Sequence, residues 1–204
     1  CDLAGCFNTN ASVEPATTNI VTNSKELKIL GLSGIYNQLL LDGQPLIQGL
    51  SYNYGVSSVP GPFVEQIFIA KGTNSVLQGA ESISGQINVI LQKPEKAPQL
   101  FVNVFLNTFL ESQYNVYSGY KLGKSQHFVG VHMVQPAKKW DKNDDNFLDL
   151  PKLTRYEILD KWTIGDEKEN GYSNRGGIRF TNERRIGGQE NFNAKTDLGS
   201  STVY

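Results

Sequence analysis

Two strand-like segments joined through a glycine-spaced connection constrain the fold of this chain more than any other feature. The segments VEQIFIAK (64–71) and QINVILQK (86–93) are rich in β-branched and other apolar residues, which favours strands. The connection contains several serines and glycines, Gly72 and Gly85 among them, a composition that favours sharp turns and close approach of the backbone. We therefore expect both segments to share one small central sheet, with a helix or helical turn near 73–80.

The chain before these segments contains further strands and turns. The pattern predicts short strands at 27–30 and 38–41, and Asp42-Gly43 is a strong turn sequence directly after the second of them. Residues 51–62 contain Gly and Pro at several positions and are predicted to form a loop. The strands at 38–41, 66–71 and 86–91 are expected to form the central sheet of one small mixed α/β unit over 25–95.

A charged, proline-bounded linker divides the chain. The sequence KPEKAP occupies 93–98, and the composition changes after it. We predict a polar, turn-rich N-terminal segment over 1–24, a first folded unit over 25–95, and a second region over 96–204.

The second region alternates between apolar and polar residues. In SQYNVYSGYKLG (112–123) and RYEILDKWTI (155–164) the even positions are mainly apolar with aromatics, and the odd positions are mainly polar. Strands are also predicted at 100–109 and 127–134, and the short connections between the strands predict an antiparallel meander. Membrane-barrel strands of about ten residues and the strands of a soluble β-sandwich both produce this alternation. At this point both fold classes stay open.

The bulk composition excludes some functions and leaves others. Lys+Arg is 19 and Asp+Glu is 20, so the chain lacks the positive charge of a nucleic-acid binder. No apolar run reaches the roughly 18 residues of a transmembrane helix. The chain begins at Cys1 without an initiator Met, and we expect it to be an internal fragment of a longer protein. Cys1 and Cys6 can form a disulfide or stay as free thiols.

Several motifs occur in the same order as in the plug domain of TonB-dependent outer-membrane receptors, which this chain resembles. The resemblance is strongest over residues 25–95. That family has a strand ending in a DG-x-P turn, then a v-E-x-I-e-V-x-K-G strand, a Ser, a Gly, and a G-x-I-N-I-I strand that leads into a barrel. Thr73 replaces a common Pro and Gln78 is inserted before a Gly, which are mild departures. Later segments are similar, less specifically, to the early barrel strands of Bacteroidetes-type members. The matching residues are Asp42, Gly43, Pro45, Glu65, Ile67, Lys71, Gly72, Ser75, Gly79, Gly85, Ile87, Asn88 and Ile90.

The resemblance implies an α+β plug domain followed by antiparallel transmembrane β-barrel strands of an incomplete barrel. A barrel of about 22 strands has a lumen too wide for side chains to fill, so a plug is physically required. The implied protein is an energy-coupled transporter in the outer membrane, without a cofactor or catalytic site, that takes up an iron–siderophore, cobalamin or metal complex. Its implied partners are the membrane lipid, a small-molecule ligand and a TonB-type energy transducer, whose docking box is expected to precede this chain. The alternative is a secreted β-sandwich module for adhesion or ligand binding.

Two groups of residues are candidate binding sites. In the family, outward-facing plug loops hold the ligand, which makes Tyr52 and Tyr54 candidates, although both rings can equally pack beneath the loop. Asp141, Asn143, Asp145 and Asp149 stand at positions 1, 3, 5 and 9 of a calcium-loop pattern. Position 6 lacks Gly and position 12 lacks Glu, so this is a weak cation site or a solvated acidic loop.

Strand parity predicts the topology of a barrel. Short turns of outer-membrane barrels are periplasmic and long loops are extracellular. The short turn at 123–125 is then periplasmic, and the long segment 136–153, with its acidic residues, faces the medium.

Overall fold

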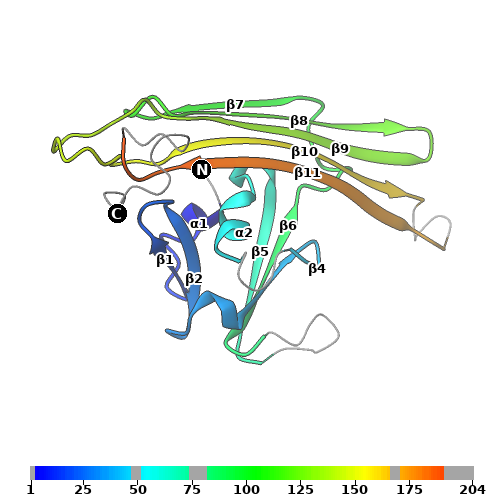
Figure 1. The fold of residues 1–204 in the computed structure, drawn as a ribbon. Coiled ribbons are helices and arrows are strands. Elements are labelled where there is room, and N and C mark those ends of the chain that lie inside the picture. Colours follow the sequence, from blue (N-terminus) through cyan, green and yellow to red (C-terminus); the bar gives the residue numbers. More distant parts are fainter. Residues whose placement is uncertain (1–2, 47–51, 74–81, 166–170, 191–204) are drawn as a thin grey trace.

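The computed structural model describes residues 3–46, 52–73, 82–165 and 171–190, which form two layers (Figure 1). The first layer, here called the N-terminal unit, comprises the described residues between 3 and 91. The second layer is a long antiparallel sheet, here called the wall sheet, which covers one side of the N-terminal unit. Among the described residues, no helix is long and apolar enough to span a membrane.

The N-terminal unit is built on a four-stranded sheet with the order β4-β3-β6-β5. Strand β3 (Asn37–Leu41) pairs parallel with β6 (Gly85–Leu91), which pairs antiparallel with β5 (Val64–Lys71). The short β4 (Gln44–Pro45) completes the sheet beside β3. The prediction that the strands at 38–41, 66–71 and 86–91 share one sheet is confirmed. The helical turn predicted near 73–80 lies, apart from Thr73, outside the described residues.

The predicted turn at Asp42-Gly43 is present and joins β3 to β4. Both residues have positive φ, 51° and 82°, as the tightest hairpin turns require. The Asp42 carboxylate accepts a hydrogen bond from the Leu91 amide at 3.1 Å, and the Gly43 amide donates to the side-chain oxygen of Asn88 at 3.0 Å. The turn is therefore fixed to β6 from the side.

The N-terminal residues contribute more to the core than their polar composition predicted. Helix α1 (Leu3–Cys6) is followed by β1 (Val13–Asn19) and β2 (Ser24–Ile29), which form a separate two-stranded antiparallel sheet. The strand predicted at 27–30 thus begins earlier and ends at Ile29, because Leu30 adopts φ 55° and turns the chain. Apolar side chains of this part are fully or almost fully buried: Leu3, Ala4, Phe7, Val13, Leu27 and Ile29.

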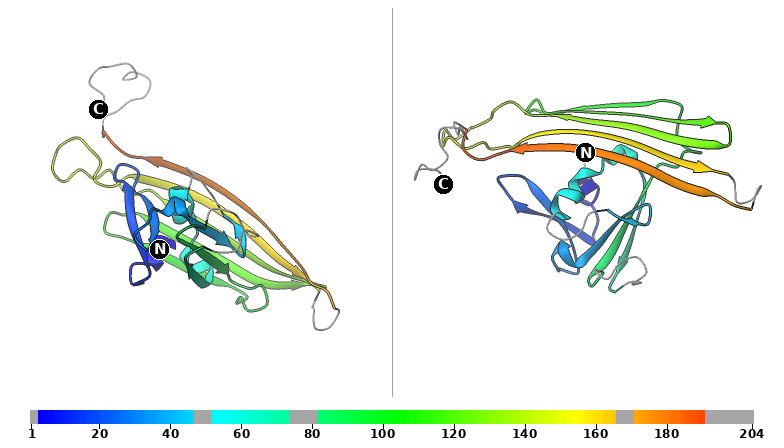
Figure 2. Two further views of the ribbon diagram at one scale, coloured as in Figure 1. Left: turned by 90° about the horizontal axis from the view of Figure 1, so that it is seen from below. Right: turned by 45° about the vertical axis from the view of Figure 1, so that its right-hand side comes forward.

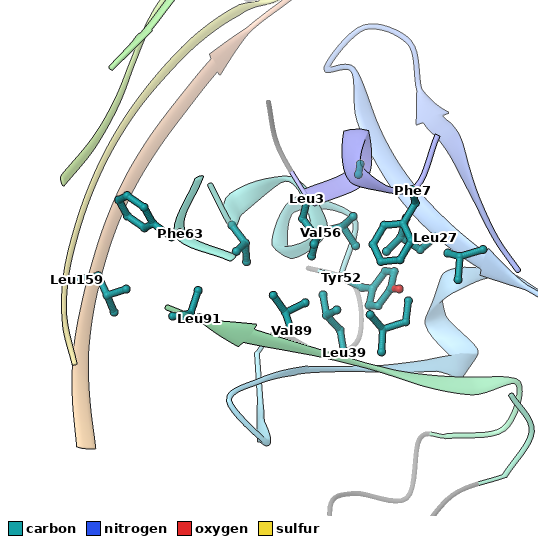
Figure 3. Packing of buried hydrophobic residues seen from close by; sticks show 14 of the residues in the cluster. Leu3, Phe7, Leu27, Leu39, Tyr52, Val56, Phe63, Val89, Leu91 and Leu159 are labelled. Carbon is teal, nitrogen blue, oxygen red and sulfur yellow. The ribbon is translucent and has the colours of Figure 1, made fainter. Parts of the chain in front are cut away.

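The loop predicted over 51–62 is wrong. Helix α2 (Tyr52–Ser58) and a 3-10 turn (Gly61–Phe63) occupy this segment, and a second 3-10 turn (Gly34–Tyr36) precedes β3. The sequence YNYGVSS has weak helix propensity, so tertiary packing must stabilise α2. Tyr52 and Val56 supply that packing, because both side chains lie in the core (Figure 3).

The wall sheet has five strands in the order β11-β10-β9-β8-β7, each antiparallel to its neighbour. It curves over the N-terminal unit (Figure 2), and it confirms the antiparallel meander predicted from the sequence. The strands are β7 (Phe101–Leu106), β8 (Ser112–Leu122), β9 (Ser125–Gln135), β10 (Lys152–Ile164) and β11 (Asn174–Ile186).

The two faces of the wall sheet differ as the alternation predicted. One residue from each strand forms a register-matched row across the outer face, and all five are apolar and exposed: Val102, Val116, Val131, Ile158 and Phe180. The opposite face packs against the N-terminal unit and not against a second antiparallel sheet. The described residues therefore do not form the β-sandwich of the alternative interpretation.

An aromatic cluster joins the two layers. Phe63 is fully buried, and its ring packs edge-on against Tyr117 of β8 and Phe128 of β9, with centroids 5.8 and 5.7 Å away. A Cβ atom at Gly130 would lie 2.8 Å from two ring carbons of Phe63, so only Gly lets the ring approach β9 this closely. Figure 3 shows Phe63 at the wall sheet, beyond Leu91 and close to Leu159.

Candidate functional site

The end of α2 meets two arginines of the wall sheet. Arg155 of β10 donates a hydrogen bond from Nη1 to the Ser57 carbonyl at 2.6 Å. Arg179 of β11 donates from Nη2 to the Ser58 carbonyl at 2.8 Å and lies 3.0 Å from its hydroxyl. The last carbonyls of a helix have no partner within the helix and carry partial negative charge. The wall sheet therefore caps a helix of the N-terminal unit.

Two carboxylates, one of them fully buried, hold these arginines in place. Glu157, whose side chain is 1% exposed, accepts hydrogen bonds from Nε and Nη2 of Arg179 at 3.0 and 2.9 Å. Glu183 accepts from Nε of Arg155 at 2.7 Å and also pairs with Arg185. Charges removed from water are tolerated when they are paired, and each of these arginines has a carboxylate partner.

A cavity of about 280 Å³ lies beside this network, between the two layers. The turn between β1 and β2, the end of α2 and the wall strands surround it. It lies at the end of the wall sheet where residues 136–151 connect β9 to β10, and the short turn at Gly123 is at the other end. Its lining residues are Thr22, Asn23, Lys25, Ser57, Asn107, Phe109, Glu111, Gln113, His132, Val134, Leu150, Pro151, Leu153, Arg155 and Arg185.

Arg185 connects the cavity to one of the predicted ligand-binding tyrosines. Its Nη1 donates to the carbonyls of Thr22 and Asn23 at 3.0 and 3.3 Å, and its guanidinium carbon lies 5.3 Å from the centroid of the Tyr54 ring. This separation is within the range of a cation–π contact. Tyr54 is 43% exposed, so its ring is accessible while it supports Arg185.

The other predicted tyrosine lies in the core. Tyr52 is 2% exposed, and Figure 3 shows its ring near Phe7, Leu39 and Val56. Burial raises the pKa of the Tyr52 hydroxyl, since the phenolate would lose its hydration. A ligand could contact this ring only if the core opened. Of the two alternatives for these tyrosines, ligand contact or packing beneath the loop, the structure shows packing for Tyr52.

The acidic segment at 141–149 satisfies its own backbone. Asp141 accepts hydrogen bonds from the amides of Asp145 and Asn146 at 3.3 and 2.8 Å, and Asp149 accepts from the Lys142 amide at 2.8 Å. Asn143 donates from its side chain to Asp145 at 2.8 Å. Within the described part of the chain, no group of three or more His, Cys, Asp or Glu is arranged to hold a metal ion. The cation role of these residues stays a prediction.

The two histidines of β9 lie on opposite faces, as predicted from their spacing. His132 is buried on the inner face, where its Nδ1 is 2.7 Å from the side-chain oxygen of Asn115. His127 is on the other face, 3.2 Å from Asp160. They therefore share no site.

Sequence reasoning missed the arginines and glutamates of the wall sheet. Their alternation with apolar residues along β10 placed Arg155 and Glu157 on the polar face, but nothing in that pattern showed that this face is buried. Their partners on β11 can be identified only from the pairing register. In that register Arg155 lies directly opposite Glu183, and Arg179 lies opposite Leu159, two residues from Glu157.

Comparison with known proteins gives consistent results for both layers. Residues 2–86 match the model of the TonB-dependent Receptor Plug Domain. The structure is similar to the FrpB iron transporter from Neisseria meningitidis (F3-3 variant), with TM-score 0.62 and 15% identity over 90% of this chain. It is also similar to the copper transporter OprC, with TM-score 0.68 and 11% identity over 92% of this chain.

A third similar structure contains a bound ligand. This is the pyoverdine outer membrane receptor FpvA from Pseudomonas aeruginosa PAO1 bound to pyoverdine, with TM-score 0.62 and 13% identity over 90% of this chain. The chain spans 29%, 29% and 25% of the lengths of these three proteins. At these identities the likeness establishes the fold, namely a plug domain followed by antiparallel strands of an incomplete barrel.

Proposed function

The chain carries the plug domain of a TonB-dependent receptor in residues 2–86, and we propose that it belongs to an energy-coupled transporter that takes up a scarce nutrient. TonB-dependent receptors are outer-membrane proteins, which places this chain in the outer membrane. The candidate cargoes are an iron–siderophore, cobalamin or another metal complex. The proposed partner is a TonB-type energy transducer, and no catalytic role is proposed.

One observation carries this proposal, namely the packing of the plug on the inner face of a sheet whose outer face is apolar. The exposed row from Val102 to Phe180 crosses all five strands. A soluble protein would expose so continuous an apolar surface only at an interface. A strand wall with an apolar outside and a polar inside is the arrangement that lipid on one face and an aqueous lumen on the other require.

The cavity beside Arg185 is the proposed place of ligand capture. It lies at the end of the wall sheet that carries the long 136–151 connection. Long connections of outer-membrane barrels are extracellular, and we therefore propose that the cavity faces the side from which a nutrient arrives. Tyr54 contributes an accessible aromatic surface near it.

Uptake measurements with the full-length receptor test the proposal. Cells that produce the receptor are given labelled ferric hydroxamate and catecholate siderophores, cobalamin and copper, with and without a protonophore. Deletion of the transducer gene and of the receptor gene provides the two controls. We expect receptor-dependent uptake of at least one compound that stops without the transducer. Uptake that persists without the transducer, or receptor found outside the outer-membrane fraction, would contradict the proposal.

A further inference from the structure

We propose that the cavity between α2 and the wall sheet is an oxyanion subsite, in which Arg185, Ser57 and Thr22 bind a carboxylate or phosphate group of the transported ligand. This inference rests on the proposed function, because it specifies the ligand chemistry of the same cavity.

Unsatisfied polar atoms around the cavity are the first observation. Nη2 of Arg185, the hydroxyl of Ser57 and the hydroxyl of Thr22 are buried and have no hydrogen-bond partner among the described residues. Ser57 is 4% exposed, and the Arg185 side chain is 9% exposed. All three residues line the one cavity. Buried donors of this kind are rarely left without an acceptor, so this group of three indicates a place for oxygen atoms.

The orientation of Arg185 is the second observation. Glu183 accepts from its Nε, the carbonyls of Thr22 and Asn23 accept from its Nη1, and the Tyr54 ring lies against its guanidinium. These contacts come from both layers and leave Nη2 as the donor without a protein acceptor. A guanidinium fixed in this way has already lost its side-chain entropy, which favours binding. Guanidinium groups recognise carboxylate and phosphate oxygens best.

The charge around the cavity favours an anion. Lys25, Arg155 and Arg185 line it, against the single carboxylate of Glu111 among the lining residues. Glu183, which pairs with both arginines, offsets one further positive charge. A ligand group with negative charge is therefore electrostatically complementary to this cavity.

The size of the cavity limits what it holds. Its volume of about 280 Å³ is just below the roughly 300–1,000 Å³ typical of small-molecule sites. It therefore suits the charged end of a ligand and not a whole siderophore or cobalamin. Phe109, Val134 and Leu153 give part of the lining an apolar character for the adjoining carbon atoms.

Binding of citrate and inorganic phosphate to the full-length receptor in detergent tests this inference by calorimetry. Triethyl citrate is the uncharged probe. Arg185→Gln removes the proposed anion donor, and Arg184→Gln is the matched control, because Arg184 is the exposed neighbour on the same strand. We expect citrate or phosphate to bind, and Arg185→Gln to weaken that binding by about tenfold or more, the effect of one charged hydrogen bond. Arg184→Gln is expected to bind like the unmodified receptor.

Three results of the binding experiment would overturn the subsite: no binding of either anion, equal binding to the Arg185→Gln variant, or equal binding of the ester. The heat-dependent gel mobility of each variant establishes that its barrel is folded. Ser57→Ala removes a hydroxyl and leaves the charge of the cavity unchanged. We expect it to weaken the binding of citrate or phosphate several-fold, independently of Arg185→Gln. Transducer-dependent uptake is scored separately, so uptake that continues at full rate in Arg185→Gln refutes the subsite and leaves the proposed function standing.

Discussion

Replacement of Phe63 by Ala should uncouple the N-terminal unit, which is the plug, from the wall sheet. Phe63 is fully buried and contacts Tyr117 and Phe128 edge-on. Loss of a buried phenylalanine side chain lowers the free energy of unfolding by about 3–5 kcal/mol, which includes the cavity that remains. With a urea dependence of about 2 kcal/mol per molar, a loss of about 4 kcal/mol lowers the unfolding midpoint of the plug by about 2 M.

The assay needs a reporter in the plug, because both tryptophans, Trp140 and Trp162, lie outside it. Cys6 is exposed in α1 and can carry a fluorophore once every other cysteine of the receptor is replaced by Ser. Urea titration of the full-length receptor in detergent then follows plug unfolding. Phe68→Ala is the matched control, since Phe68 is 55% exposed, and its midpoint should move by less than about 0.5 M. Equal shifts for Phe63→Ala and Phe68→Ala would refute the aromatic junction.

Gly130 provides a double-mutant test of the same contact. A methyl group at this position would lie 2.8 Å from the Phe63 ring, which is fully buried. Gly130→Ala alone should destabilise the plug by about 1–3 kcal/mol. In the Phe63→Ala background the methyl group fits, so the two effects should be clearly non-additive. Additive effects would show that the ring and the glycine are not in contact.

Two further pairs of variants test the buried charges and the outer face. Glu157→Gln removes the fully buried carboxylate that pairs with Arg179 and should cost about 3–5 kcal/mol in the urea assay. Glu65→Gln breaks a pair with Lys96, whose side chain is 65% exposed, and should cost less than about 1 kcal/mol. Similar values would contradict the pairing of Arg179 with Glu157. Phe180→Arg, in the middle of the outer face, should destabilise the barrel in lipid vesicles by about 2–4 kcal/mol, and Ile186→Arg, at the strand end, by about 0–1 kcal/mol. Refolding yield measured by unheated gel mobility compares the last two, and an equal yield would argue against a lipid-facing centre.

Local sequence patterns predicted the strands because the residues that specify them are neighbours in the chain. The β-branched residues of 64–71 and 86–91, the Asp42-Gly43 turn and the alternation of 112–122 act over a few positions, and the structure has strands or turns at each. The face that each side chain takes also followed from the alternation. What the alternation left open was which face is covered by the plug.

Helix α2 and the candidate site could not be predicted in the same way, because their partners are distant in sequence. Ser57 and Ser58 are capped by arginines 98 and 121 residues further along the chain. The segment containing them reads locally as a loop, since Gly55 and the serines disfavour a helix. Arg185 likewise contacts the β1–β2 turn, 163 residues earlier in the chain.

The division of the chain at residues 24 and 95 stays a prediction.

The side of the membrane on which each end of the wall sheet lies tests most directly whether this chain is the plug and first wall of an outer-membrane receptor. Asn146→Cys and Lys124→Cys are introduced separately into the full-length receptor with its native cysteines replaced by Ser, and intact cells are treated with a membrane-impermeant thiol reagent. Both positions are exposed in the structure, so a difference in labelling reports the side of the membrane and not burial. We expect labelling at 146 and protection at 124 until the outer membrane is permeabilised. Labelling at 124 with protection at 146 would reverse the topology and remove the cavity from the extracellular side, and equal labelling of both would contradict a wall that spans the membrane.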